Sequence, residues 1–145
     1  MHPVLSLPLV LVLVLSPFAT QIRAQQASSS QDQVLTQQCL DSFDMIKNQD
    51  LDAFVARMPY QPSAKEREYA GEILQRSHKR WYLDRTMDEI TPKGVIYSKA
   101  DESKRQKGAI LEARVKLLIT SSNKQASVSC KFVETAEGWF LSKLP

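Results

Sequence analysis

Two cysteines, Cys39 and Cys130, have the most definite chemistry in this chain. In an oxidising compartment an even pair of cysteines predicts one disulfide, which here closes a loop of about 90 residues. The alternative is two buried thiols that do not meet. A zinc site needs further ligands, and His78 is the only histidine after residue 24. We therefore expect neither a bound metal ion nor a cofactor.

His78 is a second residue that is capable of chemistry, as a general base. It stands beside Lys79 and Arg80 near the end of a predicted helix, where a cation complements the helix dipole. That position favours a structural role. No serine lies in a nucleophile-elbow motif, and neither cysteine has a plausible base partner nearby in the sequence. The sequence therefore names no catalytic residue.

The N-terminal segment indicates the compartment. Residues 9–15 are a run of leucine and valine between Pro8 and Pro17, and Ala24 follows. This is the layout of a secretory signal peptide, and the run is shorter than the roughly 20 residues that span a bilayer. We predict a signal peptide over 1–24, with an uncleaved N-terminal anchor as the alternative. The mature protein is then secreted or periplasmic, without stable membrane insertion after cleavage.

The remaining chain has the size and charge of one domain. Loss of Arg23 with the signal peptide lowers the formal net charge from +3 to +2. Such a balance does not indicate a dedicated nucleic-acid binder, so we expect no nucleic-acid partner. Residues 25–32 carry no apolar side chain larger than alanine and predict a flexible leader. A single domain over 33–145 follows.

Helical periodicity dominates the first half of that domain. A helix over 33–48 carries an apolar stripe that includes Cys39, and a short helix with its own stripe follows it. A third helix runs to about Arg80. Their predicted N-terminal capping residues are Asp32, Asp50 and Ser63, the last in a capping box with Glu66.

The second half alternates with a period of two, which is typical of strands. The predicted strands cover residues 81–90, 95–97, 109–120, 126–134 and 139–144, with turns at 91–94, 121–124 and 135–138. The order predicts an α+β fold in which three N-terminal helices pack on one face of a four- to five-stranded antiparallel sheet. If Cys130 faces the helices, it points toward Cys39.

Three stretches carry a family resemblance: the turn in 46–54, the hairpin of 112–119 and 127–134, and the acidic-Gly-Trp-x-aliphatic pattern of 137–144. They resemble small secreted bacterial domains of the nuclear transport factor 2-like (cystatin-like) superfamily, which includes lumazine-binding-protein-like members of unknown function. Gln49 stands where the family commonly has glycine. The resemblance implies a curved sheet that forms a cone with the helices, open at one end.

Enzymes of this shape that resemble ketosteroid isomerase use a carboxylate base together with a tyrosine and a neutral acid in an apolar pocket. By this resemblance the candidates are Asp84, Asp88, Glu112, Tyr69 and Tyr82. The alternative is that they are solvated strand charges and core tyrosines. Because the fold class hosts binders as well as enzymes, it does not supply a function.

The terminal strand and a basic connection are the remaining hints of binding. Trp139 lies on one face of the strand, and Phe140 and Leu144 lie on the other. Because the helices pack on one face only, one of these apolar sets must be buried by another segment, a ligand or a partner chain. We predict a binding surface there, formed as a dimer contact between sheets, with local burial of both sets as the alternative. The charged connection 99–107 is suited to an anionic envelope component or an acidic protein, although such runs are usually solvated loops.

These observations favour a secreted or periplasmic, non-catalytic binding domain that acts through its cavity or a sheet face. Its partner is a small apolar ligand or a protein, and a homodimer is a further option. An envelope inhibitor or immunity-like protein is one alternative, and a small isomerase or dehydratase is another. An open pocket of several hundred cubic ångström favours a ligand, whereas a filled cone favours a protein partner.

Overall fold

The structure is a computed structural model that describes residues 18–122 and 124–145, with side chains described from residue 29 onward. Its helices are α1 (Phe18–Asn48), α2 (Leu51–Ala56), α3 (Ala64–His78), the π-helical turn η1 (Lys79–Leu83) and α4 (Glu102–Arg105). Its strands are β1 (Glu89–Lys99), β2 (Leu111–Ser121), β3 (Lys124–Thr135) and β4 (Gly138–Lys143). The chain therefore has the predicted α+β class.

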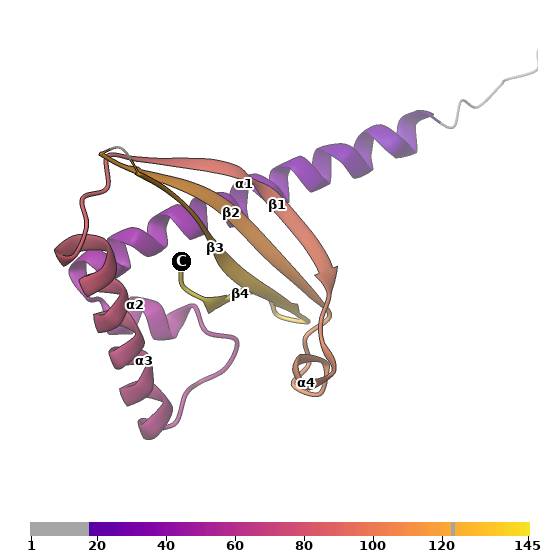
Figure 1. The fold of residues 1–145 in the computed structure, drawn as a ribbon. Helices are drawn as coiled ribbons and strands as arrows, with labels where there is room; N and C mark the ends of the chain where they lie inside the picture. The colour runs from indigo at the N-terminus through magenta and orange to yellow at the C-terminus, as the bar shows by residue number, and fades with distance from the viewer. Residues whose placement is uncertain (1–17, 123) are drawn as a thin grey trace, which may run out of the picture.

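The strands of the described residues form one antiparallel meander in the order β1-β2-β3-β4, and the sheet does not close. Figure 1 shows that the sheet is curved, that α1, α2 and α3 lie inside the curve, and that the N-terminal part of α1 extends beyond the sheet. The predicted order of helices followed by a sheet is confirmed.

The helices α1, α2 and α3 pack on one face of the sheet. Alternate residues of β2 are buried, as the period of two predicts: Ala113, Val115, Leu117 and Ile119. They share one apolar core with the helices, whose main contributions are Leu35, Cys39, Phe43, Ile46, Phe54 and Leu74. We call this side of the sheet the inner face and the opposite side the outer face.

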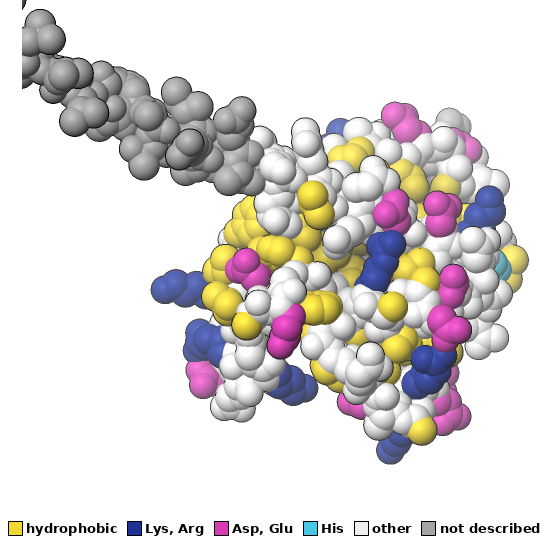
Figure 2. All heavy atoms as spheres, turned by 180° about the vertical axis from the view of Figure 1, so that it is seen from behind, with side chains coloured by type: hydrophobic (Ala, Val, Ile, Leu, Met, Phe, Trp, Pro, Cys, Tyr) yellow, Lys and Arg dark blue, Asp and Glu magenta, His cyan; other side chains and the backbone are white. Residues whose placement is uncertain are grey.

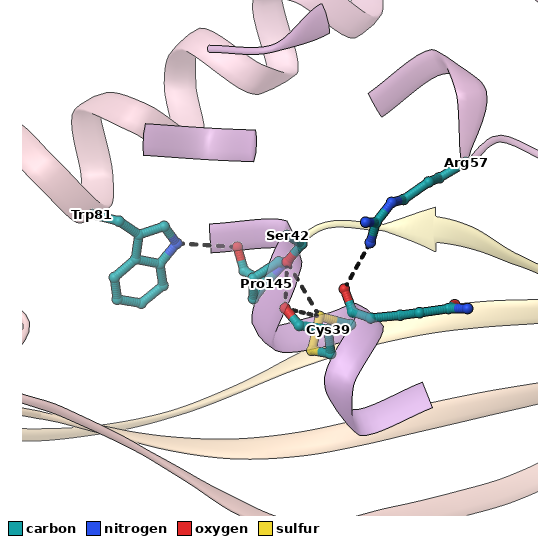
Figure 3. Close-up of a disulfide and its surroundings, with 7 residues drawn as sticks. Cys39, Ser42, Arg57, Trp81 and Pro145 are labelled. Atoms are coloured by element: carbon teal, nitrogen blue, oxygen red, sulfur yellow. Dashed lines mark hydrogen bonds between the residues drawn. A yellow bond between two sulfur atoms is a disulfide. The ribbon is translucent and has the colours of Figure 1, made fainter. Parts of the chain in front are cut away.

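A disulfide ties the first helix to the sheet. Cys39 on α1 and Cys130 on β3 are bonded, with a Cα–Cα distance of 5.7 Å, and both side chains are fully buried. Ser42 is buried beside the bond (Figure 3), where its hydroxyl donates to the Cys39 carbonyl at 2.6 Å. The predicted disulfide is confirmed.

The predicted N-terminal caps of α2 and α3 are confirmed. The Asp50 carboxylate accepts the Ala53 amide at 3.0 Å and caps α2, and Ser63 and Glu66 form the capping box of α3. Between α1 and α2, Gln49 has a left-handed φ of 51°. This conformation favours glycine, the residue that is common there in the family that the sequence resembles.

The start of α1 differs from the prediction. The helix includes residues 25–32, where the sequence predicts a flexible leader, and begins at Phe18 instead of after Asp32. The cause is local: no proline or glycine occurs between Phe18 and Asp32, and the alanines and glutamines there are compatible with a helix. Asp32 is consequently an internal helix residue and not a cap.

The predicted strand over 81–90 is wrong. Trp81 lies seven residues after Leu74 and continues the buried stripe of α3 into the turn η1. The predicted turn at 91–94 is also wrong, because β1 continues through it with a bulge between Pro92 and Gly94. Since β1 is an edge strand, it tolerates a proline that cannot donate to a neighbour.

Candidate functional site

An open cavity of about 680 Å³ lies at the end of the sheet where β2 turns into β3. The segment from η1 to Thr86 forms one wall, and the β2–β3 hairpin forms the other. Its lining includes Trp81, Asp84, Arg85, Ile119, Lys124 and Ala126.

Trp81 forms the apolar base of this cavity and is held in place on several sides. Its indole N–H donates to the Pro145 carbonyl at 3.1 Å (Figure 3), and its ring meets Phe43 edge to face at 6.1 Å. Only 2% of Trp81 is exposed. The π turn brings it there, because the Asp84 amide bonds to the Lys79 carbonyl at 2.8 Å. Such turns occur often at functional sites.

The linker after η1 is tied to the hairpin by hydrogen bonds. The Thr86 and Ser121 hydroxyls are 3.3 Å apart, and the Asp88 amide donates to the Thr120 carbonyl at 2.9 Å. The Asp88 carboxylate accepts the amide of Ser122, a residue with a left-handed φ of 50°. These bonds hold both walls of the cavity in a fixed relation.

The charged groups of the cavity are two cations and one carboxylate. The Arg85 guanidinium lies 5.5 Å from the centre of the Trp81 ring, a distance at which a cation is attracted to an aromatic face. Lys124 lies on the hairpin wall, and Asp84 is the acidic lining residue. Within the described part of the chain, neither Arg85 nor Lys124 forms an ion pair.

A smaller hollow of about 300 Å³ lies beside the C-terminus, between α2 and α3. Its lining combines apolar residues with Arg76 and Arg80. The hollow contains none of the residues that the sequence analysis nominated for catalysis.

The structure disperses the carboxylate and tyrosine candidates. Asp84 lines the cavity, but Asp88 is held by the hairpin amide and Glu112 lies on the outer face in an ion pair with Lys104 at 2.7 Å. Tyr69 is 57% exposed. Their positions do not form the carboxylate–tyrosine pair that the resemblance implies.

Tyr82 and His78 join the ends of two helices. The Tyr82 hydroxyl donates to the Phe43 carbonyl at 2.8 Å, and its ring stacks on His78 with centres 5.7 Å apart. Burial, followed by the nearby Asp44 carboxylate, raises the pKa of Tyr82. His78 Nδ1 lies 3.0 Å from the Ile46 carbonyl, so its contact with the end of α1 is structural.

The terminal strand is covered more completely than the sequence suggests. Leu144, which strand alternation places with Phe140, instead lies in the main core with 5% exposure. The reason is that β4 ends at Lys143, so alternation no longer sets its direction. Phe140 packs with Val133 beneath Ala100 and Ala109. The predicted surface of Trp139, Phe140 and Leu144 is therefore corrected at Leu144.

Trp139 remains close to the surface. It packs against the main core while partly exposed, and Tyr97 meets its ring edge to face at 5.8 Å. The Tyr97 hydroxyl donates to Asp32 of α1 at 2.6 Å. Seen from behind, a group of hydrophobic side chains lies on the left of the domain, with acidic and basic side chains around it and across the rest of this face (Figure 2).

Two of the four basic residues in the connection 99–107 form ion pairs with nearby acidic residues. Lys104 contacts Asp101 and Glu112, and Arg105 contacts Glu102. The hydrogen bonds that the Lys104 ammonium donates to Asp101 and Glu112 raise the pKa of Lys104. The connection therefore folds onto the outer face at one end of the sheet and does not present a free cluster of cations.

Sequence reasoning nominated Asp84 and noticed Trp81 but did not bring them together with Ser121, Lys124 or Ala126. The available signal was the seven-residue step from Leu74 to Trp81, which continues a helical stripe. The hairpin residues carried no such signal, because a polar turn between two strands looks the same in the sequence whether or not it lines a cavity.

No protein-family model, curated protein or solved structure matches this chain. The class of protein is therefore defined by its structure alone. It is a disulfide-linked α+β domain whose sheet carries helices α1–α3 on one face and has an open cavity at one end. Among the described helices, none is long and apolar enough to cross a membrane.

Proposed function

We propose that this protein is an exported, non-catalytic binding domain that holds a small ligand in the cavity beside Trp81. The observation that carries the proposal is the open cavity of about 680 Å³, with an apolar base and a few polar groups around it. Ligand sites are commonly concave, largely preformed and between about 300 and 1,000 Å³. The tethered linker supports a preformed site.

The lining suggests the chemistry of the ligand. Ala126 offers apolar contact above the buried Trp81 and Ile119. Arg85 and Lys124, in a lining that also includes Asp84, offer positive charge without an ion-pair partner among the described residues. A small molecule with an apolar body and one acidic group satisfies both. Such a ligand fits the expectation of a small apolar ligand and adds an anionic end.

A binding role is better supported than catalysis. General acid–base chemistry requires a base within about 3 Å of the proton that it removes, in a site with its partner groups. The candidates Asp88, Glu112 and Tyr82 are each engaged in other contacts, at different places in the fold. The cavity offers Asp84 with neither a nominated tyrosine nor a second carboxylate.

Export and family membership belong to the same proposal. The disulfide supports an oxidising compartment, and the predicted signal peptide 1–24 supplies the route, although its residues 1–17 lie outside the described part. Helices inside a curved sheet support the cystatin-like arrangement. Mature protein that begins near Gln25 in the exported fraction is the expected result.

The ligand site can be tested with 8-anilinonaphthalene-1-sulfonate, a fluorescent probe that has an apolar body and one anionic group. We expect saturable binding of one probe per protein. Ala126→Phe fills the cavity and should weaken binding at least tenfold, while Ala136→Phe on the exposed β3–β4 turn is the matched control. Arg85→Gln together with Lys124→Gln should weaken binding about tenfold. Equal affinity in all of these variants contradicts the proposal.

A further inference from the structure

The outer face of the sheet carries cations that form no ion pair with any residue that the structure describes. On β2, Arg114 and Lys116 alternate with buried inner-face residues and are exposed. Arg114 stands directly opposite Lys131 of β3 in the strand register. We call Arg114, Lys116 and Lys131 the outer-face cations.

These cations have no acidic partner within the part of the chain that the structure describes. None of the three occurs in its ion pairs. The nearest acidic residue along β2, Glu112, is already engaged by Lys104 at 2.7 Å. On β1, Glu89 pairs with Thr120, four residues beyond Lys116 along β2. The face therefore presents positive charge.

The arrangement has a cost for the free protein. Side chains directly opposite on antiparallel strands lie about 5 Å apart, and like charges in such positions destabilise the sheet. Arg114 and Lys131 occupy such a pair. An anion bound across the strands removes this repulsion, so the outer-face cations are suited to binding a polyanion.

The surroundings of the cations indicate the kind of anion. The neighbouring outer-face positions carry Ser127, Ser129 and Leu118, with Ile96 opposite Arg114. These positions include no aromatic residue on which a nucleic-acid base could stack. Ile96 is the one large hydrophobic residue among them that is highly exposed, at 49%. That is little apolar surface for insertion into a membrane.

We propose that the outer-face cations bind a linear sulfated polysaccharide that lies across β2 and β3. Sulfate groups repeat along such a polymer, and each can contact one cation while the serine hydroxyls donate hydrogen bonds. Arg114 and Lys131 lie on neighbouring strands about 5 Å apart, and Arg114 and Lys116 lie about 7 Å apart along β2. This surface is distinct from the cavity, which lies at the hairpin end of the inner face.

The test measures the affinity of the exported protein for heparin decasaccharide over a series of salt concentrations. The logarithm of the binding constant should fall with the logarithm of salt with a slope of about three, one for each cation. Each neutralisation should weaken binding about fivefold, and Arg114→Gln, Lys116→Gln and Lys131→Gln together about a hundredfold. Lys65→Gln on α3 removes the same charge from an exposed position elsewhere and should leave affinity unchanged.

The melting temperature without heparin distinguishes lost binding from lost folding. It should stay the same or rise slightly in Lys131→Gln, because the repulsion with Arg114 is relieved. Loss of affinity in Lys65→Gln equal to that in Lys131→Gln overturns the proposal. Binding of desulfated heparin or of phosphatidylglycerol vesicles as tightly as heparin also overturns it.

Discussion

The two faces of the sheet are built from the same strands but have different consequences. The inner face is apolar, is covered by three helices and is linked to α1 by the disulfide. The outer face is mainly polar and is covered only where the connection around α4 folds over Phe140. Alternate residues of one strand therefore differ in role: the inner set builds the core and, at the hairpin end, lines the cavity, whereas the outer set is mostly free of the core.

The difference also places the two proposed sites. The cavity lies at the β2–β3 hairpin end of the inner face. Apolar residues of the strands meet the polar residues of the hairpin turn there. The outer-face cations lie in the middle of the strands, where β2 and β3 are paired on both sides. A small ligand fits the first place, and an extended polymer fits the second.

Removal of the disulfide should have the largest effect on stability, because it releases the inner face from α1. Replacing both Cys39 and Cys130 by serine opens a loop with a sequence separation of 91 residues. We expect a loss of about 4–5 kcal/mol in the free energy of unfolding, measured in urea. A loss below about 1 kcal/mol means that α1 is held to the sheet by packing alone.

Truncation of Trp81 should have the next largest effect. Trp81→Ala removes a side chain with 2% exposure and its hydrogen bond to Pro145, so we expect a loss of about 3–5 kcal/mol. Leu83→Ala, two residues away with 70% exposure, is the control and should change stability by less than about 0.5 kcal/mol. Similar losses in both variants contradict the assigned burial of η1.

Phe140 tests the one covered part of the outer face. Because it packs partly buried with Val133, Ala100 and Ala109, Phe140→Ser should cost about 1–2 kcal/mol, less than a core aromatic. Ile110→Ser, at a position with 55% exposure, is the control. Unchanged stability with weaker self-association supports instead the interaction surface that the sequence predicts at β4.

The contact between Lys104 and Glu112 should have the smallest effect. Both side chains are partly exposed, so Lys104→Gln should cost less than about 1 kcal/mol. The raised pKa of Lys104 sets the sign of the pH dependence. The contribution is fully present below the ordinary lysine pKa of 10.5 and is lost as pH rises through the folded value. The stability difference from the variant should therefore shrink at high pH; a growing difference contradicts this sign.

Local signals predicted much of the fold. The capping groups of Asp50 and Ser63 act within a few residues, and the alternation over 109–120 reports a half-buried strand directly. The disulfide was predicted because Cys39 and Cys130 each lie on an apolar face and because the expected compartment is oxidising. These features depend on short-range chemistry and on periodicity, which a sequence displays.

The features that the sequence did not reveal depend on tertiary contacts. Trp81 belongs to a helix because its indole reaches Phe43 and Pro145, and β1 continues past Pro92 because it is an edge strand. The cavity joins the segment after α3 to a hairpin about 40 residues later, and no local pattern marks that meeting. The cover over Phe140 likewise comes from a connection that the sequence presents only as charged.

The central claim, that the inner face of the sheet supplies most of the stability and the outer face little, is tested most directly at two adjacent residues of β2. Leu117 is fully buried on the inner face, and Leu118 is partly exposed on the outer face. In urea unfolding, Leu117→Ala should lose about 3–4 kcal/mol, whereas Leu118→Ala should lose about 1 kcal/mol or less. Equal losses would contradict a one-sided core, because the outer face would then be packed as tightly as the inner one.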